Sequence, residues 1–256
     1  MPATTKTARK RINTEKVEML KSYKMLPFKA ANETQQELYH QALNAPLTIA
    51  IGPAGTGKSF VGAYAACRLL VEKQIEKIIL TRTPLPTGPS MGFFAGTGQE
   101  KMAVWLAPIL GTIKKILKTP AGTDGYFNSL IEKGQIEFQP LETIKGSSFD
   151  DSFILVEEAQ ELTFEQLSSL TTRIGDNSHL FLNGDFAQYN TRNREPLALE
   201  GLVNVIREDH EFLDRGYEVD EWESIRVPVI EFTSDEIVRS DITRKMVKLL
   251  EKMREG

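Results

Sequence analysis

The sequence predicts an α/β fold with a mostly parallel sheet covered by helices on both faces. Two observations predict it. Short apolar segments rich in β-branched and aromatic residues alternate with segments of helix length, a pattern typical of parallel strands joined by helices. A glycine-rich stretch also lies between the first such strand and the helix after it. With 256 residues, 41% apolar and 26% charged, we expect a single globular domain.

Six segments have the character of buried strands. In chain order they are PLTIAIG (46–52), KIILTRT (77–83), QIEFQP (135–140), SFILVEE (152–158), HLFLNGD (179–185) and VPVIEF (227–232). Helices are predicted at Thr34–Leu43, Ser59–Glu72, Gln99–Leu117, Phe164–Ile174 and Pro196–Arg207, with a terminal helix after Arg239. Residues 1–14 are polar and basic, so we expect a solvated tail there and the domain in residues 15–256.

Composition excludes several classes of protein. A single cysteine and three histidines make a disulfide framework or a Cys/His zinc site implausible. No apolar run approaches the roughly 20 residues of a membrane helix, and no apolar stretch follows the basic N-terminus as in a secretory signal. We therefore expect a cytoplasmic protein without membrane contact. The net charge of -4 gives no general attraction to nucleic acid, which would need a local basic surface.

The glycine-rich stretch fits the phosphate-loop pattern G-x-x-x-x-G-K-[ST]. Its glycines allow backbone amides to turn around phosphate oxygens, and the helix that follows adds its positive end. We expect Lys58 to reach the β and γ phosphates of a nucleoside triphosphate and Ser59 to bind Mg²⁺. The alternative is a turn that only packs strand against helix. The predicted nucleotide-binding residues here are Gly52, Pro53, Ala54, Gly55, Thr56, Gly57, Lys58, Ser59 and Phe60.

Two further polar groups follow strands. Glu157 and Glu158 end a buried run, where uncompensated charge is costly unless a cation or ligand meets it. We expect Glu157 to face Mg²⁺ and Glu158 to polarise the attacking water, although adjacent acids on a helix surface carry no function. In LFLNGDFAQ (180–188), Asp185 and Gln188 are candidates for sensing the γ-phosphate, and the alternative is a turn capped by Asp185.

Six motifs in a fixed order give the chain a resemblance to a known family. They are GPAGTGKS, LTRTPLPTGPSMGFFAGTGQEK, IEFQPLETIKG, FILVEEAQELTFEQLSSLTTRIG, GDFAQ and EIVRS. In this order the chain resembles the PhoH family of ATPases, relatives of superfamily 1 helicases. The resemblance implies a single RecA-like P-loop NTPase core that binds and hydrolyses ATP with Mg²⁺. It also implies a hexameric ring and single-stranded RNA or DNA as partner.

The resemblance assigns two further residues and exposes departures. It implies that Gln36 reads the adenine base, although a lone glutamine is more often a solvated helix residue. It implies that Arg239 acts as an arginine finger, and we expect it to act on the ATP of a neighbouring subunit. The family has Asp where this chain has Glu157, and Pro where this chain has Thr83.

The loop that follows the second strand is a candidate surface for nucleic acid. Phe93 and Phe94 could stack on bases, while Arg82 and Lys101 meet phosphates. The two phenylalanines could equally pack into the core or into a subunit interface. Two other functions stay open: a nucleotide-switched assembly or scaffold protein with slow ATP turnover, and a small-molecule kinase.

Overall fold

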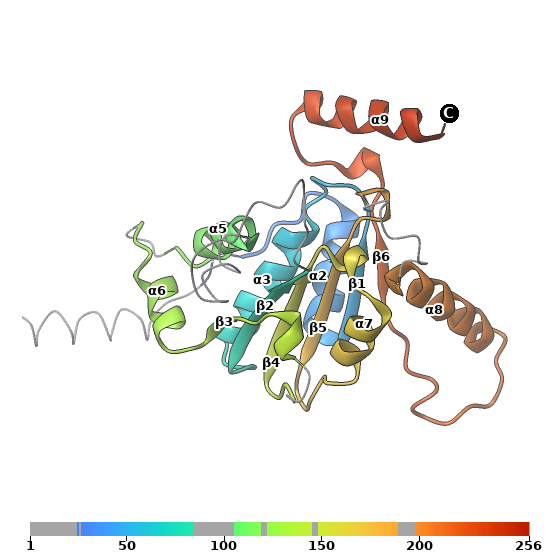
Figure 1. Ribbon diagram of the computed structural model, residues 1–256, viewed down its shortest axis with the longest axis horizontal. Helices are drawn as coiled ribbons and strands as arrows, with labels where there is room; N and C mark the ends of the chain where they lie inside the picture. The colour runs from blue at the N-terminus through green and yellow to red at the C-terminus, as the bar shows by residue number, and fades with distance from the viewer. Residues whose placement is uncertain are drawn as a thin grey trace, which may run out of the picture.

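The computed structural model describes residues 25, 27–83, 105–118, 122–144, 148–188 and 198–255 (Figure 1). Their centre is a six-stranded sheet in the order β3-β2-β4-β5-β1-β6, and every paired strand is parallel. The strands are β1 (Leu47–Ile51), β2 (Lys77–Arg82), β3 (Ile136–Phe138), β4 (Ser152–Glu157), β5 (His179–Gly184) and β6 (Val229–Glu231). All six predicted strands are confirmed.

The strand order places the predicted motifs at one edge of the sheet. β5 lies between β1, which precedes the glycine-rich loop, and β4, which ends in the acid pair. This separation of the two strands by a third is the arrangement of RecA-like cores, so the predicted α/β fold is confirmed. Because all strands run in parallel, the carboxyl ends of β1, β4 and β5 meet at the same edge.

Alternate residues of each strand enter two separate cores. Phe153 and Leu155 of β4 pack into one cluster of buried apolar side chains, while Ile154 and Val156 pack into the other. This alternation follows from the two-residue period of a strand. It requires apolar side chains at almost every position, which is why these strands read as continuous apolar runs.

Helices cover both faces, and Figure 1 shows the sheet between them. Helices α2 (Glu33–Asn44), α3 (Lys58–Val71), α5 (Ala107–Ile116) and α6 (Gly125–Glu132) pack on one face. On the other lie α7 (Phe164–Thr171) and α8 (Ala198–Asp214). Helix α6 was not predicted, and α8 extends beyond its predicted end.

The last helix stands apart from both layers. Helix α9 (Asp241–Glu255) begins directly after Arg239 and Ser240, as predicted, and Figure 1 shows it above the sheet. Short 3₁₀ turns complete the described elements, at Leu141–Thr143, Ala159–Glu161, Phe186–Gln188 and Ser234–Glu236. Among the described residues, no helix is both long and apolar enough to cross a bilayer.

Candidate nucleotide site

The glycine-rich loop has a shape that glycine alone allows. Gly52 has a φ of 134°, and a Cβ there would lie 2.3 Å from the carbonyl oxygen of Phe232. Gly57 has a φ of 93° and precedes the first residue of α3. These left-handed conformations are accessible to glycine at little cost. The loop therefore turns tightly from β1 into α3, so that the amino end of the helix opens toward the carboxyl edge of the sheet.

Lys58 lies inside this loop with only 7% of its surface exposed. Its ammonium donates hydrogen bonds to the carbonyl oxygens of Gly52 at 2.6 Å and Pro53 at 3.0 Å. Burial lowers the pKa of Lys58, and nearby carboxylates, that of Asp185 most, oppose the shift. The loop thus surrounds the ammonium group of Lys58.

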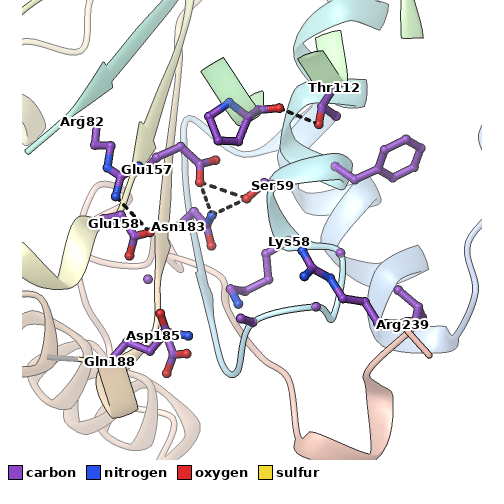
Figure 2. Close-up of a pocket in the computed structure, with 17 residues that line it drawn as sticks. Lys58, Ser59, Arg82, Thr112, Glu157, Glu158, Asn183, Asp185, Gln188 and Arg239 are labelled. Carbon is purple, nitrogen blue, oxygen red and sulfur yellow. Dashed lines mark hydrogen bonds and ion pairs between the residues drawn. The ribbon is translucent and has the colours of Figure 1, made fainter. Parts of the chain in front are cut away.

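A three-residue hydrogen-bond cluster joins the ends of three segments. Ser59 Oγ donates to Glu157 Oε2 at 2.9 Å, and Asn183 Nδ2 lies 2.8 Å from Ser59 Oγ and 2.9 Å from Glu157 Oε2. Figure 2 shows the three side chains meeting beside Lys58. The sequence prediction paired Ser59 with Glu157 and missed Asn183. Its place, two residues before Asp185 at the end of a buried strand, is the signal that could have found it.

The same cluster carries two buried oxygen atoms, Glu157 Oε1 and Asn183 Oδ1, without a hydrogen-bond partner among the described residues. Burial raises the pKa of Glu157 to about 7, although its hydrogen bonds with Ser59 and Asn183 act in the opposite direction. Unpartnered buried oxygens are costly. A carboxylate oxygen, an amide oxygen and a hydroxyl are the donors that Mg²⁺ prefers, so these residues fit the metal that the sequence predicted.

No trio of His, Cys, Asp or Glu side chains suited to a metal ion occurs within the described ranges. A metal ion at this cluster would therefore not be bound by three such side chains of the described residues. Mg²⁺ in nucleotide sites is commonly bound by one or two protein groups together with substrate phosphates and water. The single carboxylate of Glu157 with Ser59 agrees with that kind of site.

Glu158 occupies a strained turn directly after β4. Its φ of 55° is left-handed, a conformation that costs a non-glycine residue free energy and that is concentrated at functional sites. Arg82 Nη2 lies 3.5 Å from Glu158 Oε1, and Gln160 Nε2 donates to Glu158 Oε2 at 2.7 Å. Both oxygens of the carboxylate are thus held. Gln160 was missed by the sequence prediction, because nothing in its spacing indicates that it turns back to Glu158.

Gln160 also links the acid pair to the next strand. Its Oε1 accepts a hydrogen bond from the backbone amide of Asp185 at 3.1 Å, and its side chain is 1% exposed. Asp185 Oδ1 accepts from the amide of Ala187 at 2.9 Å, so the predicted turn cap is present. Gln188 follows in the same turn and lines the cavity.

These groups surround one cavity of about 390 Å³ at the carboxyl edge of the sheet (Figure 2). Its wall carries Lys58, Ser59, the acid pair, Asp185 and the predicted Gln188. Arg239 reaches it from the segment before α9: the Val238 amide donates to the Gly55 carbonyl at 2.9 Å, and a Cβ on Gly55 would lie 3.2 Å from Arg239 Cδ. Arg239 therefore borders the loop of its own chain.

Two predicted residues lie differently from what the sequence suggested. Gln36 is exposed on α2, whereas its neighbour Gln35 is buried and donates through Nε2 to the Thr56 carbonyl at 2.8 Å. The helix turns Gln35, not Gln36, toward the loop, so Gln36 is a poor candidate for reading the base. Arg82, predicted to meet nucleic acid, instead contacts Glu158 and the Trp105 carbonyl. Phe93, Phe94 and Lys101 lie outside the described residues.

The chain matches the sequence pattern of a family described as "PhoH-like protein" over residues 27–251. It is 30% identical to a PhoH-like protein of Synechocystis sp. over 83% of this chain and 63% of that protein. Against a PhoH-like protein of Bacillus subtilis, identity is 28% over 92% and 67%, respectively. Against Protein PhoH of Escherichia coli, it is 26% over 86% and 57%. The chain thus spans roughly two thirds or less of these relatives.

Among solved structures, the large terminase of a thermophilic bacteriophage in complex with ADP aligns with 87% of this chain and 50% of its own. The identity is 13% and the TM-score is 0.43.

Proposed function

This chain belongs to the PhoH-like protein family, and from that premise we propose that it binds ATP with Mg²⁺ and hydrolyses it to ADP and phosphate. The single observation that supports the proposal best is the cluster of Ser59, Glu157 and Asn183 directly beside Lys58. It joins a metal-binding donor set to a phosphate loop at the carboxyl edge of a parallel sheet. A nucleoside triphosphate bound with Mg²⁺ needs an anion site and a divalent cation site in contact.

The loop residues would bind the phosphates. Backbone amides at the amino end of α3 offer hydrogen bonds and a favourable dipole to anionic oxygens. Lys58 would exchange its two hydrogen bonds with loop carbonyls for phosphate oxygens, and the lysine is already at the centre of the loop. In that role its charge would offset negative charge as the γ-phosphoryl group is transferred.

Ser59 and Glu157 would hold Mg²⁺, with Asn183 fixing the orientation of both side chains. The ion would supply positive charge that offsets the negative charge of the phosphates. Glu158 is the candidate for orienting and polarising the attacking water, because Arg82 and Gln160 fix its carboxylate at the rim of the same cavity. Asp185 and Gln188 would detect the γ-phosphate.

We further propose that the chain works as a ring of subunits on single-stranded RNA or DNA, as the family resemblance implies. A competing proposal is a nucleotide-switched assembly protein with slow turnover. Glu157, which stands where the family has Asp, is compatible with this alternative. Among the candidate functions, a small-molecule kinase has the least support, since a kinase gains nothing from a water-polarising Glu158.

The test is phosphate release from Mg-ATP. Lys58→Ala should lower kcat/KM by about 10²- to 10³-fold, as loss of one preorganised charge does. Glu158→Gln should still bind ATP and should stop hydrolysis. Lys133→Ala, an exposed lysine at the end of α6, is the matched control and should behave like the wild type. Hydrolysis by Lys58→Ala within a few-fold of wild type would contradict the proposal.

The same assay separates the finer proposals. Strong stimulation by single-stranded RNA or DNA supports a nucleic-acid motor. Slow turnover that neither polymer changes supports the switch, and dependence on a small acceptor supports a kinase.

A further inference from the structure

Helix α9 exposes an apolar stripe to solvent. Five large apolar side chains at helical spacing lie on one side of the helix, and each is between 44% and 77% exposed. They are Ile242, Met246, Leu249, Leu250 and Met253. A contiguous exposed stripe of this kind marks an interaction site more often than scattered surface residues do.

The helix contacts its own chain through other side chains. Arg244 Nη2 donates to the carbonyl oxygen of Ile237 at 2.9 Å, and Lys248 forms an ion pair with Asp235. Both partners belong to the short segment that connects β6 to α9. An isolated amphipathic helix normally turns its apolar face inward, whereas α9 turns charged groups toward its own chain. Within the described residues, the stripe is therefore left for another surface.

A second exposed apolar surface lies elsewhere on the chain, and it is acidic. We call residues 208–226, the second half of α8 and the loop after it, the acidic arm. It carries eight acidic residues and two arginines. Its exposed apolar side chains are Phe212, Tyr217, Trp222 and Ile225, and the rings of Phe212 and Tyr217 stack with 4.8 Å between their centroids.

The two surfaces have complementary charge. Helix α9 carries five basic and three acidic residues, so its net charge is +2, against −6 for the acidic arm. Lys245 and Lys252 are exposed, and they line a shallow hollow together with Leu249 of the stripe. Complementary potentials of this kind speed association and select the partner, while the apolar contacts supply affinity.

One chain does not bring its own two surfaces together. Figure 1 shows α9 above the edge of the sheet that carries the glycine-rich loop, and α8 with its following loop at the side and below. We propose that α9 docks through its apolar stripe on the acidic arm of a second copy of this chain. The contact is head to tail, because each copy offers one stripe and one arm, and such contacts close into rings or extend into filaments.

Docking would also reach the nucleotide site. The segment that leads into α9 is bonded to the glycine-rich loop through the Val238 amide, and Arg239 follows it. A neighbour that fixes α9 would therefore fix Arg239 against the loop of the same chain. The stripe and the acidic arm are thus the surfaces through which the proposed ring would assemble. Docking between them does not require ATP hydrolysis.

Sedimentation of the nucleotide-free full chain over a range of concentrations tests the proposal. The wild type should self-associate, more weakly at high salt because charge pairs are screened. The stripe variant Leu250→Glu/Met253→Glu and the arm variant Trp222→Glu/Ile225→Glu should each raise the dissociation constant by more than about 30-fold. Phe164→Glu changes an apolar residue that is 74% exposed on α7 and is the matched control.

A mixture of the two variants gives the sharpest result. One intact stripe and one intact arm remain per pair, so the mixture should form 1:1 dimers and nothing larger. Self-association of the stripe variant alone, self-association of the arm variant alone, or a mixture that stays monomeric would each overturn the proposal. A wild type that stays monomeric would also overturn it, and binding of that monomer to anionic lipid vesicles would assign the stripe to a membrane surface instead.

Two controls separate folding and hydrolysis from docking. Because all four substituted side chains are exposed, each variant should keep the melting temperature of the wild type. Lys58→Ala should self-associate like the wild type although it hydrolyses little ATP. A wild type that assembles but does not hydrolyse ATP would refute the proposed ATPase and leave the docking surface intact.

Discussion

Arg82, at the end of β2, and Glu158, in the turn after β4, form an ion pair with 3.5 Å between Nη2 and Oε1. Their strands are neighbours in the sheet, and their last residues are in register, Arg82 with Glu157. Arg82 is therefore opposite Glu157 in the sheet, but its side chain contacts the next residue, Glu158. This contact makes Arg82 a candidate for positioning the Glu158 carboxylate, and its role at nucleic acid stays a prediction.

Arg82→Gln should lower kcat by about 10-fold with little change in ATP affinity, because Glu158 would then be held by Gln160 alone and small misplacements of a catalytic group are costly. Combined with Glu158→Gln, the Arg82 substitution should cost nothing more, since it acts through the same carboxylate. Steady-state kinetics of the two single variants and the double variant measure this coupling. Faster hydrolysis by Arg82→Gln would instead show that the ion pair inhibits Glu158.

Asn183→Ala should raise the Mg²⁺ concentration that gives half-maximal hydrolysis by about 10-fold or more, because side chains that orient metal ligands typically change metal affinity by this amount. The substitution removes the hydrogen bonds to Ser59 and Glu157 but neither of those side chains. A Mg²⁺ titration of the ATPase at saturating ATP measures it. Asn204→Ala, on the exposed side of α8, is the control. An unchanged Mg²⁺ requirement would show that Asn183 is structural.

Without metal, the folded protein should lose stability as pH rises through the pKa of about 7 of Glu157. This pKa lies above the ordinary value of 4.5, so the folded state favours the protonated form. The stabilisation is complete below pH 4.5 and is lost by about pH 8, amounting to about 3 kcal/mol. Denaturant unfolding in EDTA between about pH 5 and 8 should therefore show a steeper decline for wild type than for Glu157→Gln. Equal declines would contradict it.

The sequence predicted the sheet well because parallel strands are buried on both faces and must be apolar almost throughout. It predicted Ser59 and Glu157 because the loop pattern and the strand end constrain them. That α2 turns Gln35 toward the loop and leaves Gln36 exposed could not be predicted, because helical phase depends on where the helix begins. Helix α6 was missed, since it has only eight residues and starts at Gly125, a residue with low helix propensity.

Contacts between side chains were the least predictable part of the site. Gln160 is two residues from Glu158 in sequence, and only the strained turn at Glu158 brings the two together. Asn183 in β5 reaches Ser59 at the start of α3, because β5 lies beside β1, the strand that leads into α3; strand order determines this contact and sequence spacing does not. Which subunit Arg239 serves is likewise a question of three-dimensional position.

Arg239 should act on the nucleotide of its own chain, contrary to the neighbour's site expected from the sequence. Its side chain packs over Gly55, and the hydrogen bond from Val238 to Gly55 ties this segment to the same loop. An arginine at the γ-phosphate is typically worth about 10³- to 10⁵-fold in rate, so Arg239→Ala should be nearly inactive.

Mixing Arg239→Ala with Lys58→Ala distinguishes the two arrangements. If Arg239 acts within its chain, every site in the mixture lacks either the arginine or the lysine, and activity should stay at the sum of the two inactive proteins. If it acts across a junction, some junctions join an intact loop to an intact arginine and activity returns. Sedimentation must show that the two variants co-assemble. A mixture of wild type and Phe164→Glu, which should both assemble, is the positive control for co-assembly. Recovered hydrolysis would place Arg239 in the neighbour's site.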